Sequence, residues 1–258
     1  MNKIHPTAII SSEVEIGENV EIGPYAIIEG KVKIGNNCKI GPFVHIQGYT
    51  EIGENTKIFT GAIIGSIPQD LKYKGDITYL KIGNNNIIRE YVTINPGTSA
   101  GEETIIGDNN LIMAYAHVAH NCKIGNNVII ANSGTLAGHV EINDYAIIGG
   151  LVGIHQFCRI GKHSIIGGCS KVVMDIIPYI VADGHPARPY GINLIGLKRR
   201  NFSEEKIKIL NDAYKIIFRS GLNTTQALKK LEEMNNCEEI REIIEFIKSS
   251  QRGIAKER

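Results

Sequence analysis

The sequence places a branched aliphatic residue at every sixth position, and this period limits what the chain can fold into. From Ile4 to Ile64, every sixth residue is isoleucine. The same phase returns over residues 82–94 and, after a second break, over residues 106–172. A short repeat of fixed length predicts stacked, equivalent structural units.

A second column of residues supports the repeat. A small or β-branched residue usually follows each aliphatic by four positions, so it lies two positions before the next aliphatic. Residues two apart in a strand point to the same face, so each hexad turns one large and one small side chain inward. Glycine often comes directly after the aliphatic, which favours a tight bend there, as at Gly17, Gly23, Gly35 and Gly125.

A hexad is too short to hold a strand and its returning partner, so each unit must pair with its equivalent one coil later. The pattern resembles known hexapeptide-repeat proteins, which implies three hexads per coil and a left-handed winding. We therefore predict a mainly β fold, a left-handed parallel β-helix of about nine or ten coils spaced ~4.8 Å apart. Two polar breaks, at residues 66–81 and 96–104, are expected to leave its wall as loops, where function often concentrates.

The repeat ends near Pro178, and a helical period follows an irregular stretch at residues 179–201. Helices are expected after the N-cap Ser203 up to Gly221, from 223 or 224 to about 234, and from about 238 to 249. We assign residues 1–190 to the β-helix and 191–258 to a C-terminal α-helical domain. That domain is expected to cap the β-helix and also to contact substrate.

Four histidines cluster in the second half of the repeat. If a coil holds eighteen residues, His120, Gly138 and Gln156 stack on one corner, with His139 and His155 beside them and His117 on the preceding strand. Imidazoles can bind zinc or act as a general base, and both options stay open at this point. Cys38, Cys122 and Cys158 fall in the inward column, so they are expected to be reduced core residues and not nucleophiles.

Composition narrows the function classes. The 28 Lys and Arg residues nearly balance the 27 Asp and Glu residues, so the net charge of +1 points to neither nucleic acid nor a membrane surface. Apolar runs are too short for a membrane span. The repeat starts at Ile4, which leaves no room for a signal peptide, so we expect a cytoplasmic protein.

The chain resembles the bacterial UDP-N-acetylglucosamine O-acyltransferases over essentially its whole length. The resemblance is carried by HVAHNCKIGN, TLAGHVEI, IIGGLVGIHQFCRIG and GLKRRNFS, and by IPQDLKY in the first loop. It implies transfer of a 3-hydroxyacyl chain from acyl carrier protein to the 3-position of the UDP-sugar, the first step of lipid A biosynthesis. It also implies a homotrimer with sites between subunits, no metal, and no cofactor besides the phosphopantetheine arm of the carrier protein.

The resemblance also assigns roles to residues. His120 is the expected general base, and the Gly138 N–H the expected oxyanion donor. Gly168 is expected to line the acyl groove and Lys171 to shorten it. Arg159, Lys162, Lys171 and Lys198 are candidate contacts for the acidic carrier protein. The expected substrate-binding residues are Asp70 and Lys72, with the adjacent subunit as their expected source, and His117, His139, Gly150, His155, Gln156, Asn193, Arg199 and Arg200.

Two departures from the best-known members bear on the acceptor. Asn121 stands where an Asp follows the catalytic histidine, and Asn95 replaces a histidine beside the second loop. An amide orients an imidazole but does not stabilise its protonated form as a carboxylate does. An alternative acceptor is therefore a 3-amino sugar, whose amine needs less help from a base.

Three other protein classes share part of this pattern. The N-acyltransferase of the same pathway carries a large N-terminal domain that is not present before Ile4. A zinc hydratase of the γ-carbonic-anhydrase type uses an HxxxxH spacing, whereas His117 and His120 are spaced HxxH. A structural or ice-binding β-helix needs an outward threonine array. The sequence leaves the acyl chain length open.

Overall fold

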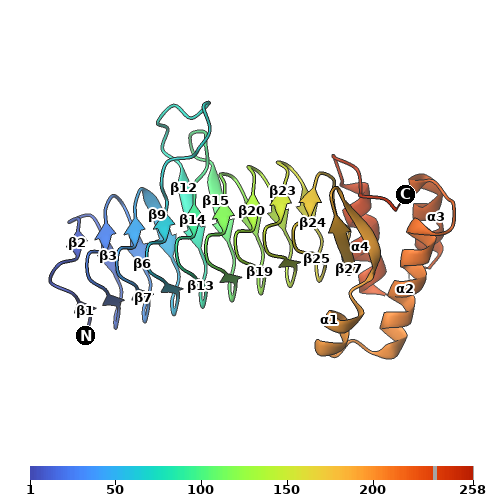
Figure 1. Ribbon diagram of the computed structural model, residues 1–258, viewed down its shortest axis with the longest axis horizontal. Coiled ribbons are helices and arrows are strands. Elements are labelled where there is room, and N and C mark those ends of the chain that lie inside the picture. The colour runs from blue at the N-terminus through green and yellow to red at the C-terminus, as the bar shows by residue number, and fades with distance from the viewer. Residues whose placement is uncertain (235–236, 258) are drawn as a thin grey trace.

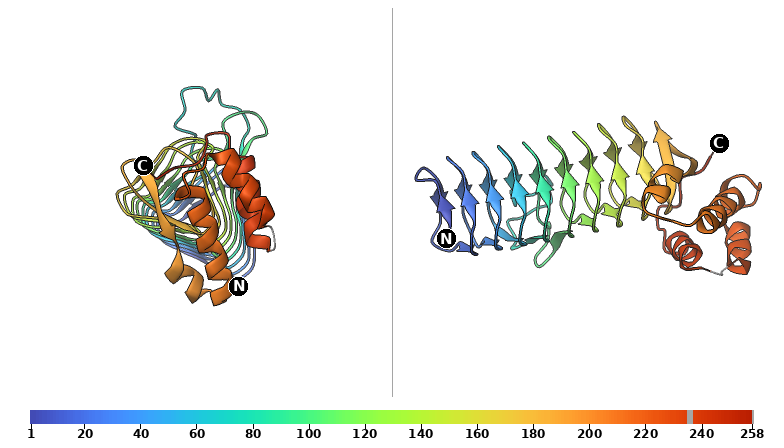
Figure 2. Two further views of the ribbon diagram at one scale, coloured as in Figure 1. Left: turned by 90° about the vertical axis from the view of Figure 1, so that its right-hand side faces the viewer. Right: turned by 90° about the horizontal axis from the view of Figure 1, so that it is seen from below.

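The computed structural model describes residues 1–234 and 237–257 and contains a long triangular prism with a helical end (Figure 1). Short parallel strands stack along the prism in three sheets, and the view along its axis shows the coils superimposed (Figure 2). The fold is the predicted left-handed parallel β-helix.

Each prism face is one sheet, named here A, B and C, and each coil contributes one strand to a face. Sheet A contains β1 (Lys3–Ile4), β4 (Glu21–Ile22), β7 (Lys39–Ile40), β10 (Lys57–Ile58), β13 (Ile87–Ile88), β16 (Leu111–Ile112), β19 (Ile129–Ile130), β22 (Ile147–Ile148) and β25 (Ile165–Ile166). Sheet B contains β2 (Ile9–Ile10), β5 (Ile27–Ile28), β8 (His45–Ile46), β11 (Ile63–Ile64), β14 (Thr93–Ile94), β17 (His117–Val118), β20 (Thr135–Leu136), β23 (Gly153–Ile154) and β26 (Lys171–Val172). Sheet C contains β3 (Glu15–Ile16), β6 (Lys33–Ile34), β9 (Tyr49–Ile52), β12 (Tyr79–Ile82), β15 (Glu103–Ile106), β18 (Lys123–Ile124), β21 (Glu141–Ile142) and β24 (Arg159–Ile160).

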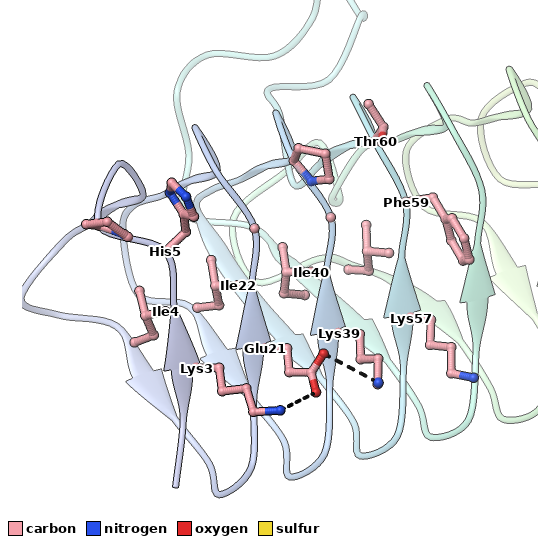
Figure 3. A pocket seen from close by; sticks show the side chains of 15 residues that line it. Lys3, Ile4, His5, Glu21, Ile22, Lys39, Ile40, Lys57, Phe59 and Thr60 are labelled. Atoms are coloured by element: carbon pink, nitrogen blue, oxygen red, sulfur yellow. Dashed lines mark ion pairs between the residues drawn. The ribbon is translucent and has the colours of Figure 1, made fainter.

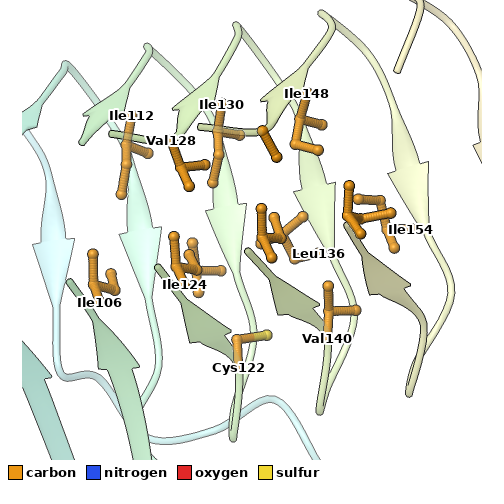
Figure 4. Close-up of a cluster of buried hydrophobic side chains, with 14 of the residues drawn as sticks. Ile106, Ile112, Cys122, Ile124, Val128, Ile130, Leu136, Val140, Ile148 and Ile154 are labelled. Carbon is orange, nitrogen blue, oxygen red and sulfur yellow. The ribbon is translucent and has the colours of Figure 1, made fainter. Parts of the chain in front are cut away.

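The prism is filled by the two inward columns of the hexad. Ile124, Ile130 and Leu136 are at most 3% exposed, and Val128 and Val140 of the small column are fully buried (Figure 4). Burying such a side chain stabilises the fold by about 1.5–3 kcal/mol. The columns predicted from the repeat are therefore the core of the protein.

The glycines after the aliphatic residues have another cause than the one we predicted. The left-handed backbone lies two positions further on, at residues such as Asn19 (φ 55°) and Tyr25 (φ 57°). At Gly23, a Cβ atom would lie 2.8 Å from the backbone nitrogen of Pro42 in the next coil. These positions need glycine because the coils approach closely, so the predicted bend at the glycine was wrong.

Side chains also link neighbouring coils along the edge between sheets C and A, called here the C–A edge. Asn36 Oδ1 accepts from the Glu18 N–H at 2.8 Å, and the bond repeats at 2.6–2.8 Å with acceptors Asn84, Asp108, Asn126 and Asp144. Each acceptor belongs to the coil after its donor, so the series forms a ladder that satisfies corner N–H groups.

Both predicted loops leave the prism at the edge between sheets B and C, the B–C edge. One connects β11 to β12 and the other connects β14 to β15, in consecutive coils (Figure 1). In the ladder on the C–A edge, hydrogen-bonded residues of consecutive coils are usually 18 positions apart. In the two coils that contain the loops, this separation rises to 30 and then to 24 positions. The insertions therefore lengthen the chain at one edge and leave strand pairing intact.

The prism ends in a hairpin and helices. In the stretch expected to be irregular, β27 (Ile180–Gly184) and β28 (Ala187–Ile192) extend sheet A, and α1 (Leu194–Arg199) follows. The expected helices are α2 (Glu204–Phe218), α3 (Thr224–Glu233) and α4 (Glu238–Lys248). None of the helices in the described part of the chain has both the length and the apolar character of a membrane span.

Candidate functional site

The predicted stack of His120, Gly138 and Gln156 is present on the B–C edge. Backbone hydrogen bonds link the consecutive coils at this stack. The His139 N–H donates to the His120 carbonyl at 3.0 Å, and the Phe157 N–H donates to the Gly138 carbonyl at 3.2 Å. A Cβ atom at position 138 would lie 2.3 Å from Cε1 of His120, so only glycine leaves room for the imidazole. In the described residues no backbone hydrogen bond is formed by the Gly138 N–H, which is the group we expect to stabilise an oxyanion.

The imidazole of His120 is oriented by its neighbour. Its Nδ1 lies 2.9 Å from Oδ1 of Asn121, whose Nδ2 donates to the Glu102 carboxylate at 2.9 Å. Because the carboxylate can only accept, the amide oxygen must face His120, and Nδ1 must carry the proton that it donates. Nε2 is then the basic nitrogen.

The first loop reaches His120 within one chain. Asp70 Oδ2 lies 3.6 Å from His120 Nε2, and the side chains of Asp70 and His120 are 26% and 14% exposed. The Lys72 side chain is exposed, while its N–H donates to Asp70 Oδ1. This contact lies within one chain, and supply of Asp70 to the sugar nucleotide by the adjacent subunit stays a prediction.

Two further predicted histidines surround His120. His139 packs edge-on against His120 with ring centroids 5.2 Å apart and stacks on Phe157 at 4.7 Å. His117 Nδ1 lies 2.7 Å from the Thr93 hydroxyl. Burial and then the nearby His120 lower the pKa of both His117 and His139, so both are neutral at pH 7.

The remaining predicted residues on this edge are exposed. His155 follows β23, and its Nδ1 lies 3.1 Å from the carbonyl oxygen of Gln156. Both side chains are open to solvent. They are therefore accessible to a ligand that lies along the edge from His120 toward the helical end.

The predicted acyl-groove residues Gly168 and Lys171, and the predicted substrate-binding Gly150, lie away from the B–C edge that carries the histidines. Gly150 and Gly168 occupy the edge between sheets A and B, where a Cβ atom on Gly168 would lie 3.4 Å from the Gly150 carbonyl oxygen. On the face of sheet B, Lys171 pairs with Gly153, above which nothing lies within 4 Å of a Cβ position. His117, Thr135, Gly153 and Lys171 thus form one cross-strand row on the outer face of sheet B.

The residues predicted to bind uridine and diphosphate lie elsewhere. The Arg200 guanidinium stacks on Tyr145 at 4.1 Å, on the C–A edge, and Arg199 is exposed at the end of α1. Asn193 is 5% exposed and caps α1, accepting from the Gly196 N–H and donating to the His163 carbonyl. One chain does not bring these residues to His120, and uridine binding by Asn193 stays a prediction.

The candidate carrier-protein contacts fall into two groups. Arg159 pairs with Glu141 at 3.2 Å and stacks on Phe246, while Lys162 pairs with Glu242 at 2.7 Å. These two cations thus attach α4 to the prism. Lys171 and Lys198 are exposed, and Lys198 pairs with Glu204 at 3.0 Å.

The cysteines in the inward column are buried and unbridged, as predicted. Cys122 Sγ contacts the Ala137 carbonyl at 3.2 Å, and burial raises the pKa of its thiol to about 12. It is therefore a poor nucleophile despite its place two residues after His120. Among the described residues, no group of three or more His, Cys, Asp or Glu side chains could hold a metal ion.

A hollow of about 630 Å³ lies on the outer face of sheet A, in the first four coils (Figure 3). Its charged residues form an exposed row in which Glu21 pairs with Lys3 at 3.6 Å and Lys39 at 3.4 Å. It lies on sheet A, whereas His120 lies on the edge between sheets B and C. We therefore place the candidate site at the B–C edge and not in this hollow.

Sequence reasoning missed two residues at or near these edges. Glu102, in the second loop, contacts Asn121, although the 19-residue separation does not follow the coil period. His163 is 6% exposed and stacks between Tyr145 and Tyr179 on the C–A edge, where burial and then Arg200 lower its pKa to about 4. The hexad phase places His163 on the C–A edge, but it does not indicate that this side chain is buried.

Asn95 anchors the first loop. Its Nδ2 lies within 3.0 Å of both the carbonyl and the hydroxyl oxygen of Ser66 and 3.3 Å from the Ile67 carbonyl. The residue is 1% exposed, and its buried Oδ1 has no hydrogen-bond partner among the described residues. Its observed role is therefore to fix the base of the loop that carries Asp70.

Comparisons with known proteins agree over the full chain. A family model described as UDP-N-acetylglucosamine O-acyltransferase, domain 2, matches residues 175–255, and one described as bacterial transferase hexapeptide (six repeats) matches residues 31–66 and 103–138. A protein of Burkholderia orbicola named acyl-[acyl-carrier-protein]–UDP-N-acetylglucosamine O-acyltransferase is 47% identical, over 99% of this chain and 100% of its own.

Solved structures give the same result. The UDP-N-acetylglucosamine acyltransferase of Bacteroides fragilis is 49% identical with a TM-score of 0.95, covering 97% of this chain and 99% of its own. The enzyme of Francisella novicida is 40% identical with a TM-score of 0.96, covering 98% and 94% of the two chains. The similarity therefore includes both the prism and the helical end.

Proposed function

Because the chain belongs to the UDP-N-acetylglucosamine O-acyltransferase family, we propose that it acylates the 3-hydroxyl of UDP-N-acetylglucosamine with a 3-hydroxyacyl chain from acyl carrier protein. This reaction is the first step of lipid A biosynthesis. The observation that carries the proposal is the state of His120, whose Nδ1–H is bonded to Asn121 and whose Nε2 is basic at an accessible edge.

His120 is the general base of the proposed mechanism. Its Nε2 takes the proton of the sugar 3-hydroxyl while that oxygen forms a bond to the thioester carbonyl carbon. The Gly138 N–H stabilises the negative charge that develops on the carbonyl oxygen. The carbon–sulfur bond then breaks, and the phosphopantetheine sulfur leaves with the proton that His120 returns. Asp70, 3.6 Å from Nε2, stabilises the imidazolium between these steps.

The complete site is proposed to form between subunits of a homotrimer. His120 lies on the B–C edge, whereas Arg200 lies on the C–A edge beside Tyr145. Contact between the B–C edge of one prism and a second prism would supply cationic groups for the diphosphate. Arginine suits that role because its guanidinium forms paired, charge-assisted bonds to phosphate oxygens.

The acyl chain is proposed to follow sheet B. The surface above Gly153 is open, and Lys171 pairs with Gly153 in the next coil. A long charged side chain at that point would limit the chain length that this surface accepts. Lys171 and Lys198 remain proposed contacts for the carrier protein because they are exposed, whereas Arg159 and Lys162 attach α4 to the prism.

The other assignments stay proposals of the same kind. The donor acyl group arrives on the phosphopantetheine of the carrier protein, and the protein uses no cofactor of its own and no metal. The proposed location is the cytoplasm. The 3-amino sugar stays a second candidate acceptor, favoured by the neutral amide of Asn121 beside His120 Nδ1.

Purified protein tests the proposal with acyl carrier proteins of graded chain length and with both UDP-sugars. We expect transfer to UDP-N-acetylglucosamine, with a sharp optimum in chain length that moves to longer chains in Lys171→Ala. A clear preference for the 3-amino sugar would select the second candidate. Failure to transfer to either sugar, or stoichiometric zinc with loss of activity on chelation, would overturn the acyltransferase mechanism.

A further inference from the structure

The second loop places a carboxylate next to the amide that orients His120. Glu102 Oε2 accepts hydrogen bonds from Asn121 Nδ2 at 2.9 Å and from the Ser99 N–H at 3.0 Å. The Thr98 hydroxyl lies 3.2 Å from the same oxygen and 3.0 Å from Asn121 Oδ1. Glu102 and Thr98 of this loop thus contact the amide beside the proposed base, and the Ser99 N–H helps to hold the Glu102 carboxylate.

These contacts fix the direction of the amide. A flipped Asn121 would turn its oxygen toward the Glu102 carboxylate and its N–H groups toward His120. That arrangement would set two acceptors against each other, and Nδ1 of His120 would have to be the acceptor. Glu102 therefore determines which imidazole nitrogen carries the proton, although it does not touch the imidazole.

The charge of Glu102 is also available to the imidazole. Its hydrogen bonds come from neutral donors, and no ion pair of Glu102 occurs in residues 1–234 and 237–257. The hydrogen bond from Asn121 is the main cause that holds the pKa of this carboxyl below its usual range. Glu102 is therefore ionised at neutral pH.

We propose that Glu102 is a positioning residue for His120, which it orients and stabilises in the protonated form through the amide of Asn121. The inference rests on the proposed function, since it concerns the same base. It also explains how an amide can occupy the position next to His120. The carboxylate is that of Glu102 in the second loop, and it is linked to His120 through the Asn121 amide.

Other charged or titratable groups also surround His120. Asp70 lies 3.6 Å from Nε2, His139 packs against the ring at 5.2 Å, and His117 is close enough for charge repulsion. These three remain in place when only Glu102 is changed. A difference between Glu102→Gln and the unchanged protein therefore reports on Glu102 alone.

The first experiment measures the pH dependence of kcat/KM for Glu102→Gln. Glutamine keeps an oxygen that can accept from Asn121, so the main loss is the charge. We expect the plateau to fall about tenfold, which is the lower end of the effect of losing an outer hydrogen-bond partner of a functional imidazole. The acid limb should move to lower pH, because His120 loses a carboxylate that favours its protonated form.

Glu103→Gln is the matched control. Glu103 is the next residue, and its carboxylate pairs with Lys81 at 2.6 Å on the outer face of sheet C. In the described residues its carboxylate forms no hydrogen bond with Asn121, so the pH profile of Glu103→Gln should coincide with that of the unchanged protein. If Glu102→Gln gives the same profile as Glu103→Gln, the proposal is wrong.

A double variant tests the direction of the coupling. Glu102→Gln combined with Asn121→Asp returns one carboxylate to the chain of hydrogen bonds, now directly beside His120 Nδ1. We expect this variant to recover to within about threefold of the unchanged protein and its acid limb to return to higher pH. A purely structural role of Glu102 in its loop predicts no such recovery.

Nitrogen NMR of the imidazoles separates this proposal from the proposed function. The unchanged protein should show His120 with its proton on Nδ1 and a titration midpoint that falls in Glu102→Gln. This readout does not depend on acyl transfer, so an inactive protein would contradict the proposed function and leave Glu102 testable. Equal midpoints in both proteins would overturn the role of Glu102.

Discussion

Two edges of the same prism use the second residue after the inward aliphatic in opposite ways. On the C–A edge, Asn126 and its equivalents accept from the corner N–H of the preceding coil. On the B–C edge the corresponding positions hold His120 and Gly138, and the Gly138 N–H has no backbone partner in the described residues. One edge satisfies its polar groups internally, whereas the other presents them to a ligand.

The comparison teaches that the candidate site lies on a different edge from the ladder, with His120 and Gly138 at the positions that Asn126 and Asp144 occupy on the C–A edge. An Asn or Asp at position 138 would satisfy the His120 N–H, but its Cβ atom would overlap the imidazole. Glycine removes that conflict, and the edge then carries a base and an unsatisfied donor one coil apart. The first prediction changes the side chain with the greatest expected effect on the B–C edge, and the second changes the one with the greatest expected effect on the C–A edge.

The largest expected effect is that of His120→Ala on the B–C edge. Removing a general base should lower kcat by roughly 10²–10⁴-fold while the thermal midpoint and the oligomeric state stay unchanged. Steady-state kinetics and a melting curve test both parts. Activity within tenfold of the unchanged protein would contradict the assignment of His120.

His163 gives the largest effect expected on the C–A edge, and it concerns stability. Its pKa of about 4 lies below the ordinary 6.5, so between these values the unfolded chain binds more protons. Stability should therefore fall as pH drops from 6.5 toward 4, by about 3 kcal/mol from this residue. His163→Phe should remove that share of the pH dependence in denaturant unfolding, and an equal slope in both proteins would refute it.

Gly138→Ala tests the close approach of the two coils. The added methyl group would displace the His120 ring, and a misplacement of about 1 Å can lower the rate ~10²-fold. Gly191→Ala is a suitable control, since nothing lies within 4 Å of its Cβ position. A crystal structure of Gly138→Ala should show the moved ring, and unchanged kinetics would contradict the steric argument.

Asn126→Ala should have the smallest effect and only on stability. It removes the acceptor for the Asp108 N–H, at 2.7 Å, and one step of the ladder. We expect a loss of about 1 kcal/mol and a melting temperature lower by roughly 2–4 °C, with kcat unchanged. Asn126→Asp keeps the acceptor but sets a carboxylate against Asp144, to which Asn126 Nδ2 donates at 3.3 Å, so it should melt below the unchanged protein. A change in kcat would show that the two edges are not independent.

The hexad predicted the prism because every coil obeys it, from Ile22 to Val172. It could not predict β27 and β28, where the repeat has ended and Pro186 and Pro189 argue against strands. These prolines are tolerated because the hairpin forms the end of sheet A, with β28 as its last strand. Local pattern is thus sufficient inside a repeat and insufficient at its end.

The candidate site also has one part that the repeat predicts and one part that it does not. His120, Gly138 and Gln156 could be stacked by counting, because they are separated by whole coils. The contacts of Asp70 and Glu102 could not, because both lie in insertions whose path is set by packing and hydrogen bonds, including the bond from Asn95 to Ser66. The family resemblance, and not counting, placed Asn193 among the substrate contacts, and neither indicated that it is also the N-cap of α1.

The two insertions at one corner also have a consequence for chain entropy. Enlarging a closed segment from 18 to 30 residues adds only about 0.5 kcal/mol to the cost of closing it, and an enlargement to 24 residues adds about 0.3 kcal/mol. The coils on either side keep their strand register. A prism of this kind can therefore change the length and content of the segments that carry Asp70 and Glu102 with little thermodynamic penalty, and its substrate preference can vary while its core stays the same.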